Sequence, residues 1–388
     1  MTHKTTPLEN IILDRVKKNG PITFAEFMSS CLYEPGLGYY TSPGKKVGAE
    51  GDFYTSSNVH KMFGRLISRE IIRMWHVLEK PSNFQIVEVG AGNGRLAADI
   101  LDAIMEIEPA LYSILTYRII EKEPSLNKSQ QELLSEHIEC LAYSTPEELE
   151  SGSLKITGCF LSNELVDALP VHIVEMTSSG LKEVMVTALD DEFQETFAQI
   201  SNPAISDYLE RINVTLLPGQ RAEVHLAADN WLRTAARAIE KGFIITIDYG
   251  YKAEELYNPM RKNGTLLCYH QHTTEENPYI RVGLQDITSH VDFSSLIKTG
   301  EEEGMETVWY GEQYRFLLAC GMMQEMMDLE SRNIPEKQKL EERLNLKKLM
   351  LPDGGMGDTF KILIQAKDVE KPDLLCLSDW SKNFPGGN

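Results

Sequence analysis

The segment with the clearest chemical pattern is residues 88–94, EVGAGNG, which lies between a strand predicted at 84–89 and a helix predicted at 96–107. Glycines at such a junction let the backbone turn sharply and let a ligand approach without a Cβ in the way. The dinucleotide spacing G-x-G-x-x-G would need a glycine at position 95, where this chain has Arg95. The alternative is a tight turn without a ligand. The candidate ligand-binding residues of this segment are Glu88, Gly90, Ala91, Gly92 and Gly94.

A carboxylate, Glu121, directly follows a second predicted strand at 117–120. A carboxylate at the end of this strand can accept hydrogen bonds from both hydroxyls of a ribose. Taken alone, a glutamate at this position is better interpreted as a solvent-exposed charge. Together with the glycine-rich segment, it indicates a nucleoside ligand.

A third group of polar residues, in the segment 163–170 (NELVDALP), follows a short strand predicted at 159–161. The amide of Asn163 can accept a hydrogen bond from a nitrogen nucleophile, and Glu164 and Asp167 could hold a cation. For a guanidinium, bidentate pairing with a carboxylate is the natural geometry. The alternative is a helix N-terminus that Asn163 caps and that the two acids stabilise through the helix dipole.

Further polar and aromatic side chains are dispersed over four irregular segments of the chain. Two histidines, His270 and His272, lie in one of them, but an H-x-H pair without a third ligand is rarely a metal site, so we expect no bound metal. The candidate residues of these segments are Gly51, Asp52, Phe53, Thr55, Asp248, Tyr249, His272 and Asp286.

These segments, in this order, resemble the MidA-like methyltransferases, and the spacing of residues 88–94 is similar to motif I of class I S-adenosylmethionine-dependent methyltransferases. The resemblance begins at ITFAEFM (22–28) and ends at MGDTFK (356–361), so it covers most of the chain. The chain departs from the family at 55–58, where it reads TSSN and the family often has T-S-P-E. It also has His270 beside His272, the histidine that matches the family pattern.

The resemblance implies S-adenosyl-L-methionine as cofactor, bound by the glycine-rich segment, Glu121 and Asn163. It implies Asn163, Glu164 and Asp167 as the residues that orient the methyl acceptor, and the dispersed residues as a lid or substrate surface. The family includes a mitochondrial complex I assembly factor that methylates a protein arginine. An arginine of a protein, in a subunit of a respiratory NADH dehydrogenase, is therefore the implied acceptor.

The composition fits a globular protein, with 42% hydrophobic and 25% charged residues in a chain of 388. A formal net charge of -20 argues against a nucleic-acid partner, because phosphate binding needs a basic face. The six cysteines include no C-x-x-C pair, as in reduced intracellular proteins. No apolar run predicts a membrane span and no targeting segment is visible, so we expect a cytoplasmic protein of a prokaryote.

Predicted strands that alternate with helices indicate an α/β fold. We expect a Rossmann-like, doubly wound and mostly parallel sheet with an antiparallel last strand. The sequence suggests an N-terminal helical or lid region at 1–80 and the sheet domain at 81–370. The domain would carry β-rich insertions at about 171–215 and 249–292, and a tail would follow at 371–388. The ligand should lie beyond the carboxyl ends of the strands.

Other functions are compatible with the same residues. The methyl acceptor could be a small-molecule amine or another protein side chain, because fold and cofactor do not determine the acceptor. A non-catalytic assembly factor that binds the cofactor or only a partner protein is a third hypothesis. A nicotinamide-dependent dehydrogenase is disfavoured by Arg95. The oligomeric state cannot be inferred from the sequence.

Overall fold

A computed structural model of the chain describes residues 5–42, 60–122, 125–351 and 356–379. The chain divides into two compact units, each built from separate segments. The first unit comprises 1–54, 166–232 and 250–299, and the second comprises 55–165, 233–249 and 300–388. Each unit is described by itself below.

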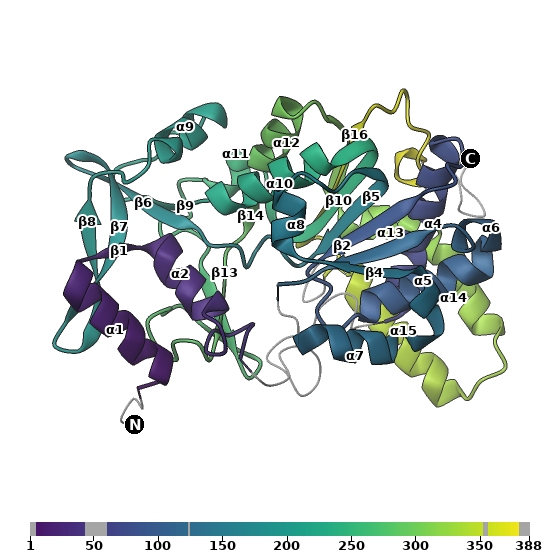
Figure 1. Ribbon diagram of the computed structural model, residues 1–388, viewed down its shortest axis with the longest axis horizontal. Coiled ribbons are helices and arrows are strands. Elements are labelled where there is room, and N and C mark those ends of the chain that lie inside the picture. Colours follow the sequence, from purple (N-terminus) through teal and green to yellow (C-terminus); the bar gives the residue numbers. More distant parts are fainter. Residues whose placement is uncertain (1–4, 43–59, 123–124, 352–355, 380–388) are drawn as a thin grey trace. The chain divides into compact units, whose positions relative to one another are not determined.

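The second unit is built on the main strands of an eight-stranded sheet, in the order β15-β16-β10-β5-β2-β3-β4 (Figure 1). The eighth strand, β14, pairs with residues 250 and 251 at the end of β10, and these residues belong with β14 to the first unit. Strands β4, β3, β2, β5 and β10 run parallel to one another, whereas β16 runs antiparallel to β10 and β15. The predicted doubly wound sheet with an antiparallel last strand is confirmed. The main strands are β2 (Gln85–Val89), β3 (Thr116–Ile120), β4 (Leu141–Ser144), β5 (Ile156–Asn163), β10 (Ile239–Tyr251), β15 (Glu306–Glu312) and β16 (Phe360–Lys367).

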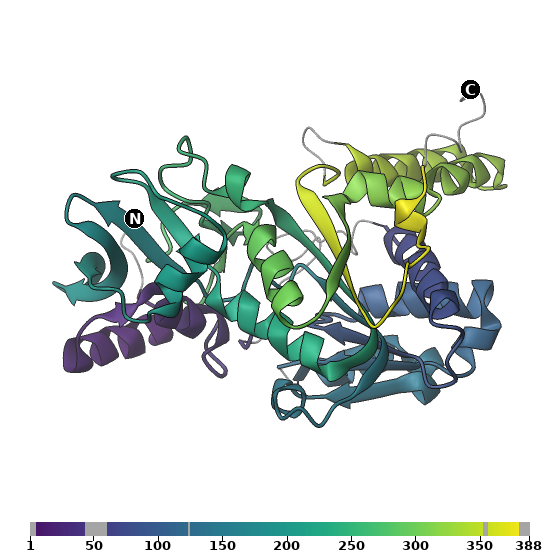
Figure 2. The same cartoon turned by 90° about the horizontal axis from the view of Figure 1, so that it is seen from above.

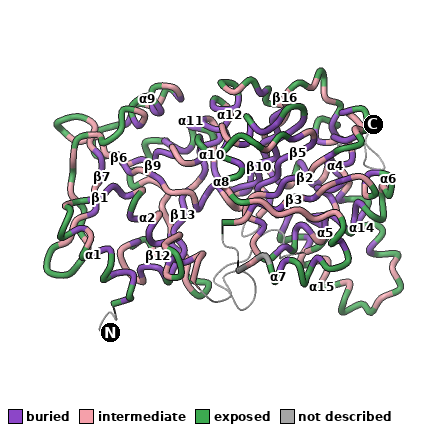
Figure 3. Tube along the Cα trace, viewed as in Figure 1, coloured by how far each residue is buried: buried purple, intermediate pink, exposed green. Residues whose placement is uncertain are grey.

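The strand order reverses beside β2, which pairs with β3 on one side and with β5 on the other. In doubly wound sheets, such a reversal leaves a crevice at the carboxyl ends of the two central strands, and ligands bind there. The local sequence explains the central strands, since β10 contains the apolar run FIITI and is buried over most of its length. Figure 3 shows the strands β2, β5 and β10 mostly buried.

Helices connect these strands and cover the sheet. The core includes Phe84, Ile86, Leu161, Phe243 and Ile364, none of which is exposed to solvent. The helices and 3-10 turns of this unit are α4 (Met62–Val77), α5 (Arg95–Ile107), α6 (Pro109–Tyr112), α7 (Ser125–Leu133), η1 (Ser135–Cys140), α8 (Pro146–Glu150), α13 (Gln313–Ala319), α14 (Met322–Ser331), α15 (Glu336–Met350) and η2 (Leu375–Leu377).

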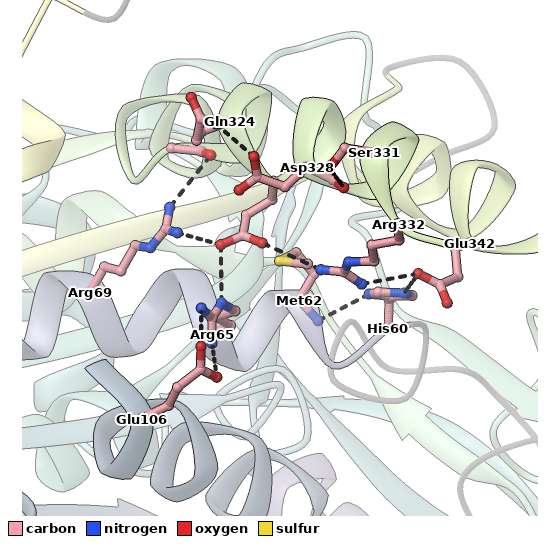
Figure 4. Close-up of polar contacts among 12 residues, drawn as sticks. His60, Met62, Arg65, Arg69, Glu106, Gln324, Asp328, Ser331, Arg332 and Glu342 are labelled. Carbon is pink, nitrogen blue, oxygen red and sulfur yellow. Dashed lines mark hydrogen bonds and ion pairs between the residues drawn. The ribbon is translucent and has the colours of Figure 1, made fainter. Parts of the chain in front are cut away.

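A cluster of charged side chains connects α4 with α14 and α15. Helices α14 and α15 lie side by side (Figure 2). Its centre is Glu325, whose side chain is 4% exposed and whose Oε1 accepts a hydrogen bond from Arg65 Nε at 3.0 Å and another from Arg69. Figure 4 labels both arginines on α4. Arg332 lies 3.8 Å from the same carboxylate and 3.5 Å from Glu342. Several opposite charges therefore compensate a carboxylate that would otherwise be costly to bury.

The first unit contains two antiparallel sheets. One has the order β1-β7-β6-β9 with β8 paired to β7, and the other has the order β12-β11-β13. A hairpin turn around residues 178–180 connects β6 to β7 within the β-rich insertion expected at about 171–215. The strands of this unit are β1 (Ile22–Thr23), β6 (His172–Thr177), β7 (Gly180–Leu189), β8 (Glu192–Ala198), β9 (Arg221–Val224), β11 (Leu267–His270), β12 (Thr273–Glu275), β13 (Asp286–Thr288) and β14 (Val291–Asp292).

Helix starts in this unit follow capping rules. Thr23 and Glu26 form a capping box at α2, in which the Thr23 hydroxyl accepts from Glu26 N and Thr23 N donates to the Glu26 carboxylate. Thr6 and Glu9 form the same motif at α1. Helices α10 and α12 continue into the second unit. The helices are α1 (Pro7–Asn19), α2 (Phe24–Tyr33), α9 (Ala204–Arg211), α10 (Leu226–Ala238), α11 (Ala253–Leu256) and α12 (Phe293–Glu302).

The division into units differs from the one that the sequence suggested. Helix α4 lies within the region expected at 1–80, but its apolar face packs in the core of the second unit. The expected tail at 371–388 also contributes to that core, since Leu374 and Cys376 are buried and the Glu70 carboxylate accepts hydrogen bonds from the backbone N–H groups of Leu375 and Cys376. Over the described residues, no helix is both long and apolar enough to cross a membrane.

Candidate active site

The glycine-rich segment forms a tight loop between β2 and α5. Gly90, Gly92 and Gly94 have φ angles of +71°, +55° and +80°, a region that favours glycine. Gly90 N donates to Ile120 O at 2.9 Å, which ties the loop to the end of β3. A Cβ at position 92 would meet no atom of the described residues within 4 Å, so these residues leave open space in front of Gly92. The segment therefore forms a cradle that a ligand can enter.

The carboxylate of Glu88 lies beneath this loop and is 3% exposed. Tyr117 Oη donates a hydrogen bond to Glu88 Oε2 at 2.8 Å. Burial raises the pKa of Glu88 to about 7, although the Tyr117 bond acts in the opposite direction and Glu121 adds a smaller increase. A carboxylate in this environment changes charge near neutral pH.

Glu121 directly follows β3, and its backbone N–H is 3.4 Å from Ser144 O at the end of β4. Its Oε1 accepts from the N–H of Lys122 at 3.0 Å. Glu88, the glycine loop and Glu121 therefore belong to the carboxyl ends of two adjacent strands, as the sequence predicted for a nucleoside site.

Asn163 and Glu164 follow at the carboxyl end of β5. Asn163 pairs with Ile247 of β10, and Glu164 N donates to Ile247 O at 2.9 Å. Glu164 has a φ of +53°, an uncommon conformation for a residue with a side chain. Such strain persists where the surrounding structure imposes it and is often associated with functional sites.

The amide of Asn163 has a defined orientation. Its Nδ2 donates to Glu164 Oε1 at 3.1 Å, which identifies Oδ1 as the acceptor end of the amide. This Oδ1 is buried and has no hydrogen-bond partner among the described residues. An unsatisfied buried acceptor costs roughly 1–3 kcal/mol, so a donor from a ligand would be favoured at this position.

Asp248 and Tyr249 lie near the end of the adjacent strand β10. Asp248 is fully buried, and its Oδ1 accepts from Tyr249 N at 2.9 Å. The ring of Tyr249 packs edge-on against Phe360 of β16, with ring centroids 5.6 Å apart. The structure thus brings together predicted residues from the carboxyl ends of β2, β3, β5 and β10 in the second unit.

The other described candidates lie in the first unit. Asp167 is 6% exposed, and its backbone oxygen accepts from Ser289 N at 3.0 Å. Asp286 begins β13 and accepts a hydrogen bond from Tyr40 Oη at 2.9 Å. His272 has a φ of +60° in the turn between β11 and β12. The candidates Gly51, Asp52, Phe53 and Thr55 lie outside the described residues.

Sequence reasoning missed three residues that support these groups. Tyr117 is on the same face of the sheet as Glu88, and the alternation of β3 could have indicated it once the register was known. Tyr40 holds Asp286 and stacks on Tyr33, with ring centroids 5.6 Å apart. Gln130 of α7 donates to Gly92 O at 2.8 Å, and no local pattern in the sequence signals that contact.

Comparisons with known proteins agree with this geometry. Residues 66–311 match a family model described as "Putative S-adenosyl-L-methionine-dependent methyltransferase". A Drosophila melanogaster protein named protein arginine methyltransferase NDUFAF7 homolog, mitochondrial, is 27% identical over 90% of this chain and 82% of its own length. A Danio rerio protein named protein arginine methyltransferase NDUFAF7, mitochondrial, is 29% identical over 84% of this chain and 79% of its own length.

A solved structure is also similar over almost the whole chain. A Burkholderia thailandensis protein bound to S-adenosyl-homocysteine superposes with a TM-score of 0.84 at 27% identity. The match covers 96% of this chain and 94% of that one.

Proposed function

The chain belongs to this family of S-adenosyl-L-methionine-dependent methyltransferases, with S-adenosyl-L-methionine as its cofactor, and on that premise we propose that it methylates an arginine nitrogen of a protein. The observation that carries the proposal is the buried, unsatisfied Asn163 Oδ1 beside the Glu164 carboxylate at the end of β5. An amide oxygen accepts a hydrogen bond from an N–H group, and a carboxylate pairs with a guanidinium.

The cofactor supplies a methyl group on a sulfonium centre. The glycine loop and Glu121 would hold the cofactor, and Asn163 and Glu164 would orient the acceptor nitrogen. Most of the rate would come from this positioning and from charges placed to match those of the transition state. A guanidinium carries its proton at neutral pH, so a carboxylate near the attacking nitrogen lowers the cost of attack by taking up charge or a proton.

Two further features support arginine as the acceptor. The acidic chain, with a formal net charge of -20, attracts a cationic substrate. The relatives named protein arginine methyltransferase share 26–29% identity with this chain. We further propose that Asp167 is another acidic group of the acceptor site. We also propose that the target is a subunit of a respiratory NADH dehydrogenase. Both proposals rest on the family resemblance.

The test is a methyl-transfer assay with labelled S-adenosyl-L-methionine and three sets of acceptors. These are arginine-containing peptides, including peptides from respiratory NADH dehydrogenase subunits, the same peptides with lysine in place of arginine, and small amine metabolites. We expect label in the arginine peptides and methylarginine after acid hydrolysis. Label only in lysine peptides or metabolites would show that the acceptor is not arginine.

A further inference from the structure

The amide of Gln130 contacts the backbone of the glycine loop. Gln130 lies on α7 and is fully buried, and its Nε2 donates a hydrogen bond to Gly92 O at 2.8 Å. A carbonyl oxygen only accepts hydrogen bonds, so this contact determines which end of the amide faces the loop. Gly92, which accepts this hydrogen bond, is the residue beside which the cradle has open space.

A second contact joins the same residue to the start of α5. Gly94, with a φ of +80°, precedes the first residue of that helix, and a Cβ at this position would lie 3.3 Å from Gln130 Cγ. Helix α7 therefore packs directly on the backbone of the loop at Gly94, while the Gln130 amide holds it at Gly92. These two contacts, at Gly92 and Gly94, hold the backbone conformation of the glycine loop, whose glycines could adopt many other conformations.

The remaining oxygen of the amide indicates that packing alone does not account for this residue. Gln130 Oε1 is buried and has no hydrogen-bond partner among the residues that the structure describes. Leaving a buried acceptor unsatisfied destabilises the fold, and an apolar side chain of similar size would avoid that cost. A glutamine at this position is explained by its bond to the loop.

We propose that Gln130 is a positioning residue of the cofactor site, which holds the loop at Gly92–Gly94 in the conformation that binds the cofactor. It acts through the backbone of the loop and does not itself take part in methyl transfer. The proposal concerns cofactor binding only, so it is independent of which group accepts the methyl.

The first test compares Gln130→Met with a matched control, Gln313→Met. Gln313 is also a fully buried glutamine of the second unit, and its Nε2 donates to a backbone oxygen, Leu349 O, at 3.2 Å. Titration calorimetry would measure the Kd of S-adenosyl-homocysteine, and thermal melting would measure stability. We expect Gln130→Met to weaken binding about tenfold without lowering Tm, since the lost bond is offset by removal of the unsatisfied acceptor. Gln313→Met should leave Kd unchanged.

The second test uses Gln130→Glu at a series of pH values, which separates a positioning role from packing. A protonated carboxyl at this position can still donate to Gly92 O, whereas an ionised carboxylate cannot and repels that oxygen. The Kd of this variant, divided by that of the wild-type protein, should approach one as pH falls from about 8.5 to about 5.5. The proposal is overturned if Gln130→Met binds within twofold of the wild-type protein, or if the ratio for Gln130→Glu does not change with pH. Absence of binding to the wild-type protein would overturn it together with the assigned cofactor.

Discussion

The buried carboxylate of Glu88 should make the stability of this protein depend on pH in a defined direction. Its pKa is about 7 in the folded chain, against an ordinary value of 4.5. Between these values the folded state binds a proton that the unfolded state has released, so the folded state loses stability as pH rises. The loss is small below pH 4.5, grows through the interval from 4.5 to 7 and is complete above it.

The substitution Glu88→Gln removes this penalty, because a glutamine of similar shape carries no charge and can still accept the hydrogen bond from Tyr117 Oη. Integration over the two pKa values gives a stabilisation of about 1 kcal/mol at pH 5.5 and about 3 kcal/mol at pH 8. Urea unfolding of both proteins at a series of pH values, followed by circular dichroism, would measure the difference in the free energy of unfolding.

A matched control is Glu325→Gln, since Glu325 is also buried but lies within hydrogen-bond distance of two arginines. Removing its charge takes a buried carboxylate away from these arginines, so it should destabilise the protein at both pH values. The account of Glu88 is refuted if the difference between Glu88→Gln and the wild-type protein is the same at pH 5.5 and pH 8.

Three other outcomes follow from the site and its surroundings. Glu164→Gln should reduce methyl transfer by at least tenfold and change the Kd of S-adenosyl-homocysteine less than threefold, and equal losses in both measurements would contradict its assigned role. The His225 imidazole is 2% exposed, and burial lowers its pKa from 6.5 to about 3, so stability should fall as pH falls below 6.5. The loss attributable to His225 is about 2 kcal/mol at pH 5, and His225→Leu should reduce the acid sensitivity of urea unfolding by that amount. Glu70→Ala removes the acceptor of two backbone N–H groups at 2.8 and 3.0 Å, so protease digestion should release the segment after residue 371 faster than in the wild-type protein.

Local sequence patterns predicted the parts of the fold that depend on neighbouring residues. The Thr-x-x-Glu pattern at 23–26 accounts for the capping box of α2, the Ser-Ser-Gly sequence at 178–180 for the turn between β6 and β7, and the apolar run FIITI for the buried strand β10. The glycine loop follows β2 for the same reason, because the strand, the turn and the helix are encoded within residues 85–107.

Contacts between distant segments could not be predicted in this way. The hydrogen bond between Tyr117 and Glu88 depends on the register of β2 and β3, and the contact of Gln130 with Gly92 depends on where α7 packs. The left-handed conformation of Glu164 is imposed by β5 and β10 together, since a residue of this type does not favour it alone. The docking of the segment after residue 371 likewise requires Glu70, which is far away in the sequence.

The assignment of compact units also required the structure. The first unit is assembled from three segments that are separated in the sequence by parts of the second unit. Hydrophobic periodicity identifies which face of a helix is buried, but not the partner against which it packs. This is why α4, with its apolar face in the core of the second unit, was expected in the N-terminal region.

The measurement that tests the central claim most directly is calorimetric titration of S-adenosyl-homocysteine into the wild-type protein, Gly92→Val and Gly152→Val. The two glycines are matched, because both have a positive φ and a Cβ at either would meet no atom within 4 Å in the part of the chain that the structure describes. Only Gly92 lies in the loop after β2, whereas Gly152 precedes the amino end of β5. The account predicts micromolar binding by the wild-type protein and Gly152→Val, and none by Gly92→Val. Absence of binding to the wild-type protein, or equal binding by Gly92→Val, would contradict a cofactor site at this loop.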